Sequence, residues 1–282
     1  QDVDLHLDRT QAPFRLQSLT GRLSGQRLAS GYAVSARRLS LRLHDGLQIE
    51  PTDFDFHWNE AGTGRPANGS FNASRLDFDT LARLAGRLPL DASSRQQLVD
   101  YAPRGTLSGL KASWTLQPGS EHASAPILDK YTISAQFSRL SLNAQGALPG
   151  FTGLSGSING DERGGSFQLD SQDAALGLPE IFADPRIELG RLTAQARWQT
   201  DEQAVTVMLQ EARFDNQDAA GSVSGHYTYP RSGQTAGVID LAARLTRGQG
   251  NAVWRYIPLV AGQEVRDWLR TSIIGGHSQD TT

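Results

Sequence analysis

The sequence predicts a mostly β protein built on a long, twisted antiparallel sheet with a few short helices. Apolar residues recur at every second position through most of the chain, which is typical of strands with one buried face. Segments rich in glycine, proline, asparagine and aspartate separate these stretches, as hairpin connections do. Apolar residues at helical spacing are confined to two places, so helices are a minor part of the fold.

The alternating stretches follow one another along the whole chain. Their apolar positions, most of them flanked by polar residues, include Leu39, Leu41, Leu43, Phe54, Phe56, Trp58, Trp114, Ile133, Phe137, Phe167, Leu169, Trp198, Val207 and Leu241. Because the other face of each strand is polar, we expect an antiparallel sheet with a single covered side. The strands of a parallel α/β sheet would be apolar on both faces.

Six turn-rich segments connect these stretches. They cover residues 45–46, 62–69, 118–126, 159–165, 200–203 and 230–237. Glycine, asparagine and aspartate tolerate the positive φ that tight hairpins require, which accounts for 29 glycines in 282 residues. No segment is long enough to indicate an interdomain linker, so residues 1–282 are interpreted as a single segment of an extended sheet.

The two helical regions lie near residues 79–101 and 253–275. In the first, Leu81, Leu84 and Leu88 share one face, and the region is predicted to form a helical insertion about 79–101. In the second, Val265 and Trp268 belong to the apolar stripe of a terminal amphipathic helix about 263–275, closed by the two glycines at 275–276. Such helices either cap the end of a sheet or are ordinary packing helices.

Composition excludes several classes of protein. The chain has no cysteine, so it holds no disulfide, thiolate metal site or cysteine nucleophile. Its net charge is -3, from 27 Lys and Arg against 30 Asp and Glu, whereas a duplex nucleic-acid binder needs a surplus of basic residues. No apolar run reaches the roughly 18 residues of a membrane-spanning helix. The chain opens at Gln1 without a signal-peptide pattern, so we expect a processed protein or an internal piece of one.

Motifs for catalysis or metal binding are missing. The histidines show no H-E-x-x-H spacing, and neither a G-x-S-x-G elbow nor a phosphate-binding glycine loop occurs. The best metal candidate is Asp53, Asp55 and His57, which alternation would place on one face of a strand. The same alternation explains them as the solvated face opposite Phe54 and Phe56. We therefore expect no enzyme, no metal and no cofactor.

The remaining question is how the apolar face is covered. A sheet with one apolar face can fold into a sandwich, close as a barrel, or curl into a groove that holds an apolar ligand. The predicted helices are too few to cover it. If the face is a groove, its candidate lipid-binding residues are Phe54, Phe56, Trp58, Trp114, Phe137, Phe167, Leu169 and Trp198.

Four stretches resemble one protein family. They are YAPRGTLSGLKASW at 101–114, LSGSINGDERGGSFQLDS at 154–171, LPEIFADPRIELGRL at 178–192 and RYIPLVAGQEVRDWLRTSIIGG at 255–276. In this order they resemble the central region of the YhdP-type AsmA-like proteins of Gram-negative bacteria. The resemblance covers most of the chain and is strongest from about residue 70 onward.

The resemblance implies a fold and a role. Such proteins are bridge-like lipid transfer proteins, anchored in the inner membrane by a helix, with a long sheet curled into an open, taco-like groove across the periplasm. This chain would be an internal segment that shields phospholipid acyl chains, with possible protein partners in the inner and outer membranes and no nucleic acid. The family is not defined by catalytic residues.

Two rival interpretations stay open at the level of the sequence. A closed β-sandwich acting as a structural or interaction module of the cell envelope would show the same alternation. A polysaccharide-binding or polysaccharide-cleaving β protein would instead need surface aromatics beside paired carboxylates, and no convincing pair is present.

Overall fold

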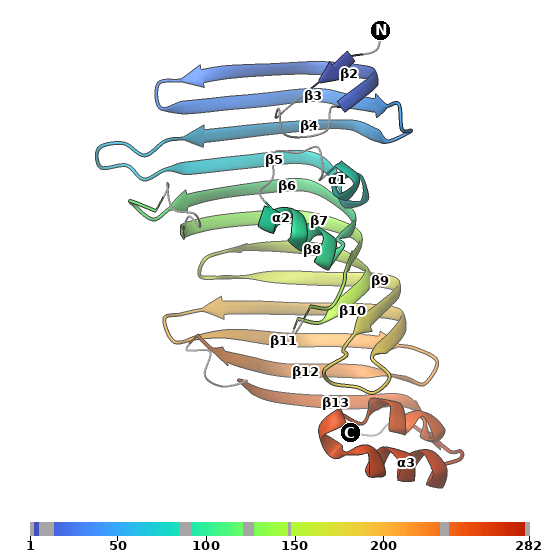
Figure 1. The fold of residues 1–282 in the computed structure, drawn as a ribbon. Coiled ribbons are helices and arrows are strands. Elements are labelled where there is room, and N and C mark those ends of the chain that lie inside the picture. The colour runs from blue at the N-terminus through green and yellow to red at the C-terminus, as the bar shows by residue number, and fades with distance from the viewer. Residues whose placement is uncertain are drawn as a thin grey trace. The chain divides into compact units, whose positions relative to one another are not determined.

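The computed structural model describes residues 3–5, 14–84, 92–120, 127–145, 148–231 and 237–279 (Figure 1). Across these residues the strands are hydrogen-bonded in sequence order from β1 to β14, in an antiparallel sheet that is not closed into a barrel. The predicted fold class is confirmed. A sandwich would need two facing sheets, whereas the described strands belong to one.

The chain divides into two compact units, which are described one at a time. The first comprises residues 1–137 and 158–162, and the second comprises residues 138–157 and 163–282. The interpretation of residues 1–282 as one segment of a longer sheet stays a prediction.

The first unit is a meander of antiparallel strands. Its strands are β1 (Val3–Leu5), β2 (Phe14–Leu28), β3 (Gly31–Leu43), β4 (Gln48–Asn59), β5 (Asn68–Asp77), β6 (Arg104–Leu116) and the parts of β7 (Leu128–Leu142) and β8 (Gly150–Asp161) that fall within it. The predicted turns at 45–46 and 62–69 connect β3 to β4 and β4 to β5. Gly46 takes a φ of +82°, in the region that favours glycine.

The second unit is also a meander of antiparallel strands. Its remaining strands are β9 (Gly164–Gly177), β10 (Arg186–Thr200), β11 (Ala204–Asp215), β12 (Ala219–Pro230), β13 (Val238–Gln249) and β14 (His277–Ser278). Asp201 closes the turn between β10 and β11, because its carboxylate accepts the backbone N–H groups of Gln203 and Ala204, both at 2.8 Å.

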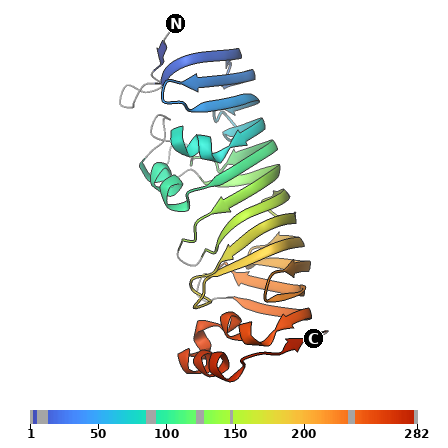
Figure 2. The same ribbon diagram turned by 90° about the vertical axis from the view of Figure 1, so that its right-hand side faces the viewer.

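The helices lie in two of the connections, as the sequence predicts (Figure 2). Between β5 and β6 are α1 (Phe78–Leu84) and α2 (Ala92–Tyr101); residues 85–91 of the predicted insertion lie outside the described residues. Between β13 and β14 are the 3₁₀ helices η2 (Gly250–Tyr256) and η3 (Leu259–Ala261), followed by α3 (Gln263–Ser272). Of the helices that the structure describes, none is long and apolar enough to cross a membrane.

The end of α3 differs from the prediction. The helix stops at Ser272, because Ile273 leaves helical geometry with φ -104° and ψ 85°. The two glycines that the sequence assigns to the helix end lead into β14 instead. The carbonyl of Gly276 accepts the N–H of Gly250 at 2.8 Å, which fixes this return of the chain.

Bulges interrupt many of the strands. Register shifts occur between β2 and β3, β3 and β4, β10 and β11, β11 and β12, and β12 and β13. Arg38 and Arg139 take positive φ values of 50° and 53°. Their N–H groups are bound by neighbouring side chains, the first by Asp53 at 2.6 Å and the second by Ser155 at 3.0 Å. A bulge bends and twists its strand, so each unit contains the device that curls a sheet.

A buried serine joins β9 to β8 in the second unit. Ser171 is 1% exposed, and its hydroxyl accepts the N–H of Ser155 at 2.9 Å and donates to the carbonyl of Ser155 at 3.2 Å. The hydroxyl therefore satisfies both backbone polar groups of Ser155.

Leucines from α1 and the sheet form a core at one end of the first unit. Leu84 of α1 is buried with Leu16, Leu43 and Leu47, all at most 5% exposed. Asp77 holds the start of α1 by accepting the N–H of Thr80 at 2.8 Å. The ends of β2, β3 and β4 that lie near α1 are therefore sealed by apolar packing.

Candidate functional site

The strand register gives the first unit an apolar face arranged in rows. Tyr32, Trp58, Gly69 and Trp114 are successive Cα partners from β3 to β6. The next row along the strands holds Val34, Phe56, Phe71 and Ala112, and the row after it holds Ala36, Phe54, Ala73 and Leu110. Because side chains of cross-strand partners lie on the same side of a sheet, these three rows form one apolar face.

Aromatic rings are in contact along this face. The ring centroids of Tyr32 and Phe56 are 5.8 Å apart, and those of Phe56 and Trp114 are 6.3 Å apart. The Trp114 indole lies over Gly69, where a Cβ would be only 2.4 Å from Cζ2 of the ring. Gly69 therefore provides the space in which this ring packs.

The second unit has an apolar face of the same kind. One row holds Trp198, Val207, Tyr227 and Ile239 on β10 to β13, beside Gly165 of β9. The next two rows hold Phe167, Ala196, Leu209, Gly225 and Leu241, and then Leu169, Ala194, Ala212, Val223 and Ala243. The partners on the opposite face are polar at most positions, for example Gln168 with Gln195 and His226 with Asp240.

The structure places the predicted lining residues on these faces. Phe54, Phe56, Trp58 and Trp114 lie together on the apolar face of the first unit, and Phe167, Leu169 and Trp198 lie together on that of the second. Phe137 is two positions from Ala135, a residue of the apolar core cluster of the first unit, so strand alternation gives both the same face. Their role in lipid binding stays a prediction.

Each apolar face is open to solvent at its outermost long strand, β2 or β13, beyond which, among the described strands, only the short strands β1 and β14 follow. On β2, Leu19 and Leu23 are 56% and 63% exposed, although their partners Leu41 and Ala36 belong to the apolar face. On β13, Ile239 and Leu241 are 64% and 53% exposed. Large side chains on the face of a packed core would be buried, so these positions indicate a surface that another apolar group can cover.

Two residues of the predicted metal candidate, Asp53 and Asp55, already have hydrogen-bond or ion-pair partners. Asp53 accepts the backbone N–H of Arg38, and Asp55 forms an ion pair with Arg37 at 2.8 Å. The pKa of Arg37 is raised by its hydrogen bond and ion pair with Asp55. Within the described ranges no group of three His, Cys, Asp or Glu side chains could hold a metal ion.

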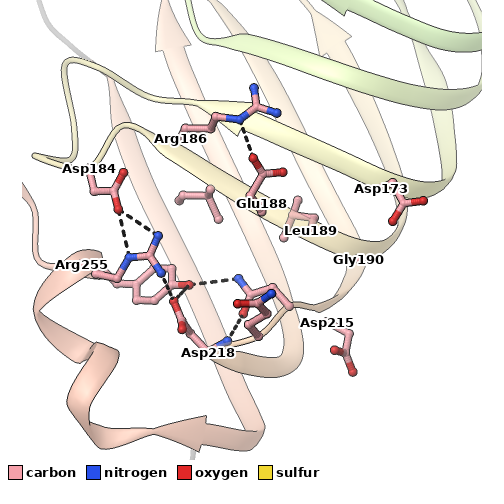
Figure 3. Close-up of a pocket in the computed structure, with 13 residues that line it drawn as sticks. Asp173, Asp184, Arg186, Glu188, Leu189, Gly190, Asp215, Asp218 and Arg255 are labelled. Carbon is pink, nitrogen blue, oxygen red and sulfur yellow. Dashed lines mark hydrogen bonds and ion pairs between the residues drawn. The ribbon is translucent and has the colours of Figure 1, made fainter.

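A cavity in the second unit is lined by several charged residues (Figure 3). It measures about 620 Å³ and lies between the start of β10, the turn from β11 to β12, and η2. Its charged lining residues are Asp173, Asp184, Arg186, Glu188, Asp215, Asp218 and Arg255. Arg186 and Glu188 pair with each other across this cavity wall.

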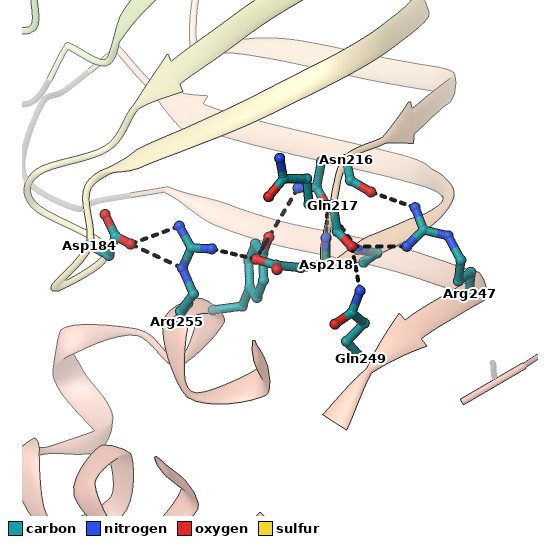
Figure 4. A network of polar contacts seen from close by, with 9 residues as sticks. Asp184, Asn216, Gln217, Asp218, Arg247, Gln249 and Arg255 are labelled. Atoms are coloured by element: carbon teal, nitrogen blue, oxygen red, sulfur yellow. Dashed lines mark hydrogen bonds and ion pairs between the residues drawn. The ribbon is translucent and has the colours of Figure 1, made fainter. Parts of the chain in front are cut away.

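Arg255 is the centre of a clamp in this cavity (Figure 4). Its Nη2 is 2.9 Å from Oδ2 of Asp184, and its Nη1 is 2.6 Å from Oδ2 of Asp218. Burial opposes the charge of Arg255, but the two aspartates outweigh it and raise the pKa of the guanidinium. The clamp joins η2 to the loop before β10 and to the turn between β11 and β12.

Tyr256 completes the clamp from the next position in η2. Its hydroxyl donates to Asp218 at 3.0 Å and accepts from the amide of Asn216 at 3.0 Å. Burial raises the pKa of Tyr256, and the hydrogen bond to Asp218 adds to the rise. Each polar group in this network has a partner on a neighbouring segment, which is typical of a structural network rather than of a site prepared for chemistry.

The clamp shows what sequence reasoning missed. Arg255 and Tyr256 stand in the Arg-Tyr-x-Pro motif, but their partners lie 37 to 71 positions away. The backbone adds to this contact, because Leu259 donates to the carbonyl of Ile181 at 2.8 Å. Asp184 and Arg255 both lie in stretches that resemble the same family, and this was the only sequence signal that could have indicated their contact.

The fold and its faces define a class: an open antiparallel β-sheet protein with one apolar and one polar face. In the part of the chain that the structure describes, the polar residues of the Arg255 clamp form hydrogen bonds and ion pairs with one another. The chain belongs to the YhdP protein family, whose pattern matches residues 1–282. The comparisons with curated proteins and with solved structures gave no match.

Proposed function

We propose that this chain is a segment of a phospholipid-transport bridge in the periplasm, running between the inner and outer membranes. In this proposal it belongs to a longer protein that a helix outside this chain anchors to the inner membrane. The apolar faces of the two units hold the acyl chains of phospholipid, and the polar faces meet water. Membership of the YhdP family supports the proposal.

The observation that carries the proposal is the row pattern of the apolar faces. In each unit, several successive strands contribute apolar partners to the same face, and large apolar side chains stay exposed on the outer strand. Burying one methylene group is worth about 0.8 kcal/mol, so a 16-carbon chain leaving a bilayer needs replacement burial worth on the order of 10 kcal/mol. A face several strands wide offers that burial.

An enzymatic role has less support than transport. The polar side chains of the Arg255 clamp pair with one another, and the clamp joins η2 to two loops of the second unit. Neither apolar face presents a nucleophile beside a base, which a catalytic site of the acyl-transfer type would need among the residues that the structure describes.

Charge on the apolar face tests the proposal. The double variant Phe56→Glu with Leu169→Glu places one carboxylate on each apolar face. The control, His57→Glu with Gln168→Glu, places the same charges one position away, on the polar faces. The readouts are the phospholipid that co-purifies with the chain, measured by mass spectrometry, and phospholipid flux in cells that depend on the gene.

The proposal predicts that the apolar-face variant loses its bound phospholipid and its transport, while the control keeps both. Circular dichroism should show the same β content in the two variants. If the apolar-face variant is folded and still binds and transports phospholipid as the control does, the proposal is wrong.

A further inference from the structure

Tryptophan and tyrosine are sorted toward one end of the strands. Within the described strands, each of these residues lies in the rows next to the hairpins β2–β3, β4–β5, β6–β7, β10–β11 or β12–β13. They are Tyr32, Trp58, Trp114, Tyr131, Trp198, Tyr227 and Tyr229, whereas Tyr101, Trp254, Tyr256 and Trp268 lie in the helices of the connections at the opposite end. The deeper rows hold phenylalanine, leucine, valine and alanine instead.

At the opposite end of the strands of the first unit, buried leucines leave no space for a polar group. There the strands meet α1, and Leu16, Leu43, Leu47 and Leu84 are at most 5% exposed. The two ends of the strands are therefore not equivalent.

Tryptophan and tyrosine have an apolar ring and a polar N–H or O–H, so they prefer the boundary between an apolar and a polar phase. Phenylalanine and leucine lack the polar group and belong inside the apolar phase. A face that is graded in this way matches an amphiphile with its polar group at the hairpin end and its tails along the strand.

The dimensions fit a phospholipid. Trp58 and Phe54 lie on one face of β4, four residues apart, which corresponds to about 13 Å along the strand. One leaflet of acyl chains in a bilayer is about 15 Å thick, half of a hydrocarbon core of about 30 Å.

We infer that the hairpin end of the first unit's apolar face is the head-group rim, where tryptophan and tyrosine lie at the level of the glycerol and phosphate of a glycerophospholipid. The acyl chains extend from this rim toward the helix end of the strands. The inference rests on the proposed function and adds the direction in which each lipid lies.

Three single-tryptophan chains test this orientation on one strand. In all of them the other four of the five native tryptophans are replaced by phenylalanine. The first keeps Trp58; the second has Phe54→Trp and Trp58→Phe; the third, a control for the polar face, has His57→Trp and Trp58→Phe. Each is loaded with phosphatidylcholine carrying a nitroxide either on the head group or near the acyl terminus, and fluorescence quenching is measured.

We expect the head-group nitroxide to quench Trp58 at least about twofold more than the tryptophan at 54, because about 13 Å separates the two positions. The acyl-terminal nitroxide should show the reverse preference, and the control should be quenched little by either. Phe71→Trp, on the neighbouring strand, replaces the second chain if that chain does not fold.

Two results would overturn the inference in distinguishable ways. Equal quenching of both apolar positions by both probes, or a head-group preference for position 54, refutes the orientation but keeps lipid on this face. Quenching of the apolar positions no stronger than that of the control refutes the proposed function as well.

Discussion

Replacing Ser171 by alanine tests whether its buried hydroxyl stabilises the pairing of β8 with β9. The side chain is 1% exposed, and its hydroxyl makes two hydrogen bonds to the backbone of Ser155. Ser171→Ala removes both and leaves the N–H of Ser155 without its acceptor, inside the sheet. A buried unpaired donor costs about 1–3 kcal/mol, so we expect the free energy of unfolding to fall by about that amount.

The assay is unfolding in urea, monitored by circular dichroism. The unfolding free energy is obtained from the midpoint and from its slope against urea concentration. Ser224→Ala, on an exposed position of β12, serves as the control and should change the unfolding free energy by less than about 0.5 kcal/mol. Ser171→Thr keeps the hydroxyl and should recover part of the loss. A Ser171→Ala chain as stable as the control would refute the reasoning, because the buried hydroxyl would then contribute nothing.

Three further predictions concern single side chains. Gly69→Ala should cost about 1–3 kcal/mol of stability and alter the near-ultraviolet signal, because the new Cβ meets Trp114 at 2.4 Å; Gly62→Ala, with open space around it, should not. Arg255→Gln should speed amide hydrogen exchange in η3, because it removes the ion pairs to both aspartates; unchanged exchange would argue against the clamp. Tyr256 has a higher pKa in the folded chain than its value of about 10 in the unfolded chain, so its contribution to stability is complete below about pH 10 and is lost as pH rises through the folded pKa. The wild type should therefore lose more stability between about pH 9 and 11 than Tyr256→Phe does. Parallel plots of unfolding free energy against pH for the two chains would contradict this explanation.

The strands and their faces follow from the sequence because alternation is a local property. The alternation of Phe54, Phe56 and Trp58 with polar residues requires one face to be apolar, whatever lies on the neighbouring strands. The positions of the hairpins follow from glycine and aspartate for the same reason. The apolar face could therefore be predicted from residues on each strand.

Features that depend on distant partners could not be predicted. The sequence shows Arg255 in a motif, but not that Asp184 and Asp218 lie beside it, because pairing depends on where two connections meet. The bulges that set the register are equally hidden, since Arg38 and Arg139 adopt a positive φ that their residue type does not favour. The end of α3 was predicted too late because the glycines that could end a helix serve the return into β14.

Photo-crosslinking at two adjacent positions of β9 tests the central claim most directly. A photoreactive phenylalanine analogue at Phe167 lies on the apolar face, and the same analogue at Gln168 lies on the polar face. The account predicts a covalent phospholipid adduct at position 167 and little at 168, identified by mass spectrometry after irradiation in cells. Equal yields at the two positions, or no lipid adduct at 167 in a folded chain, would contradict it.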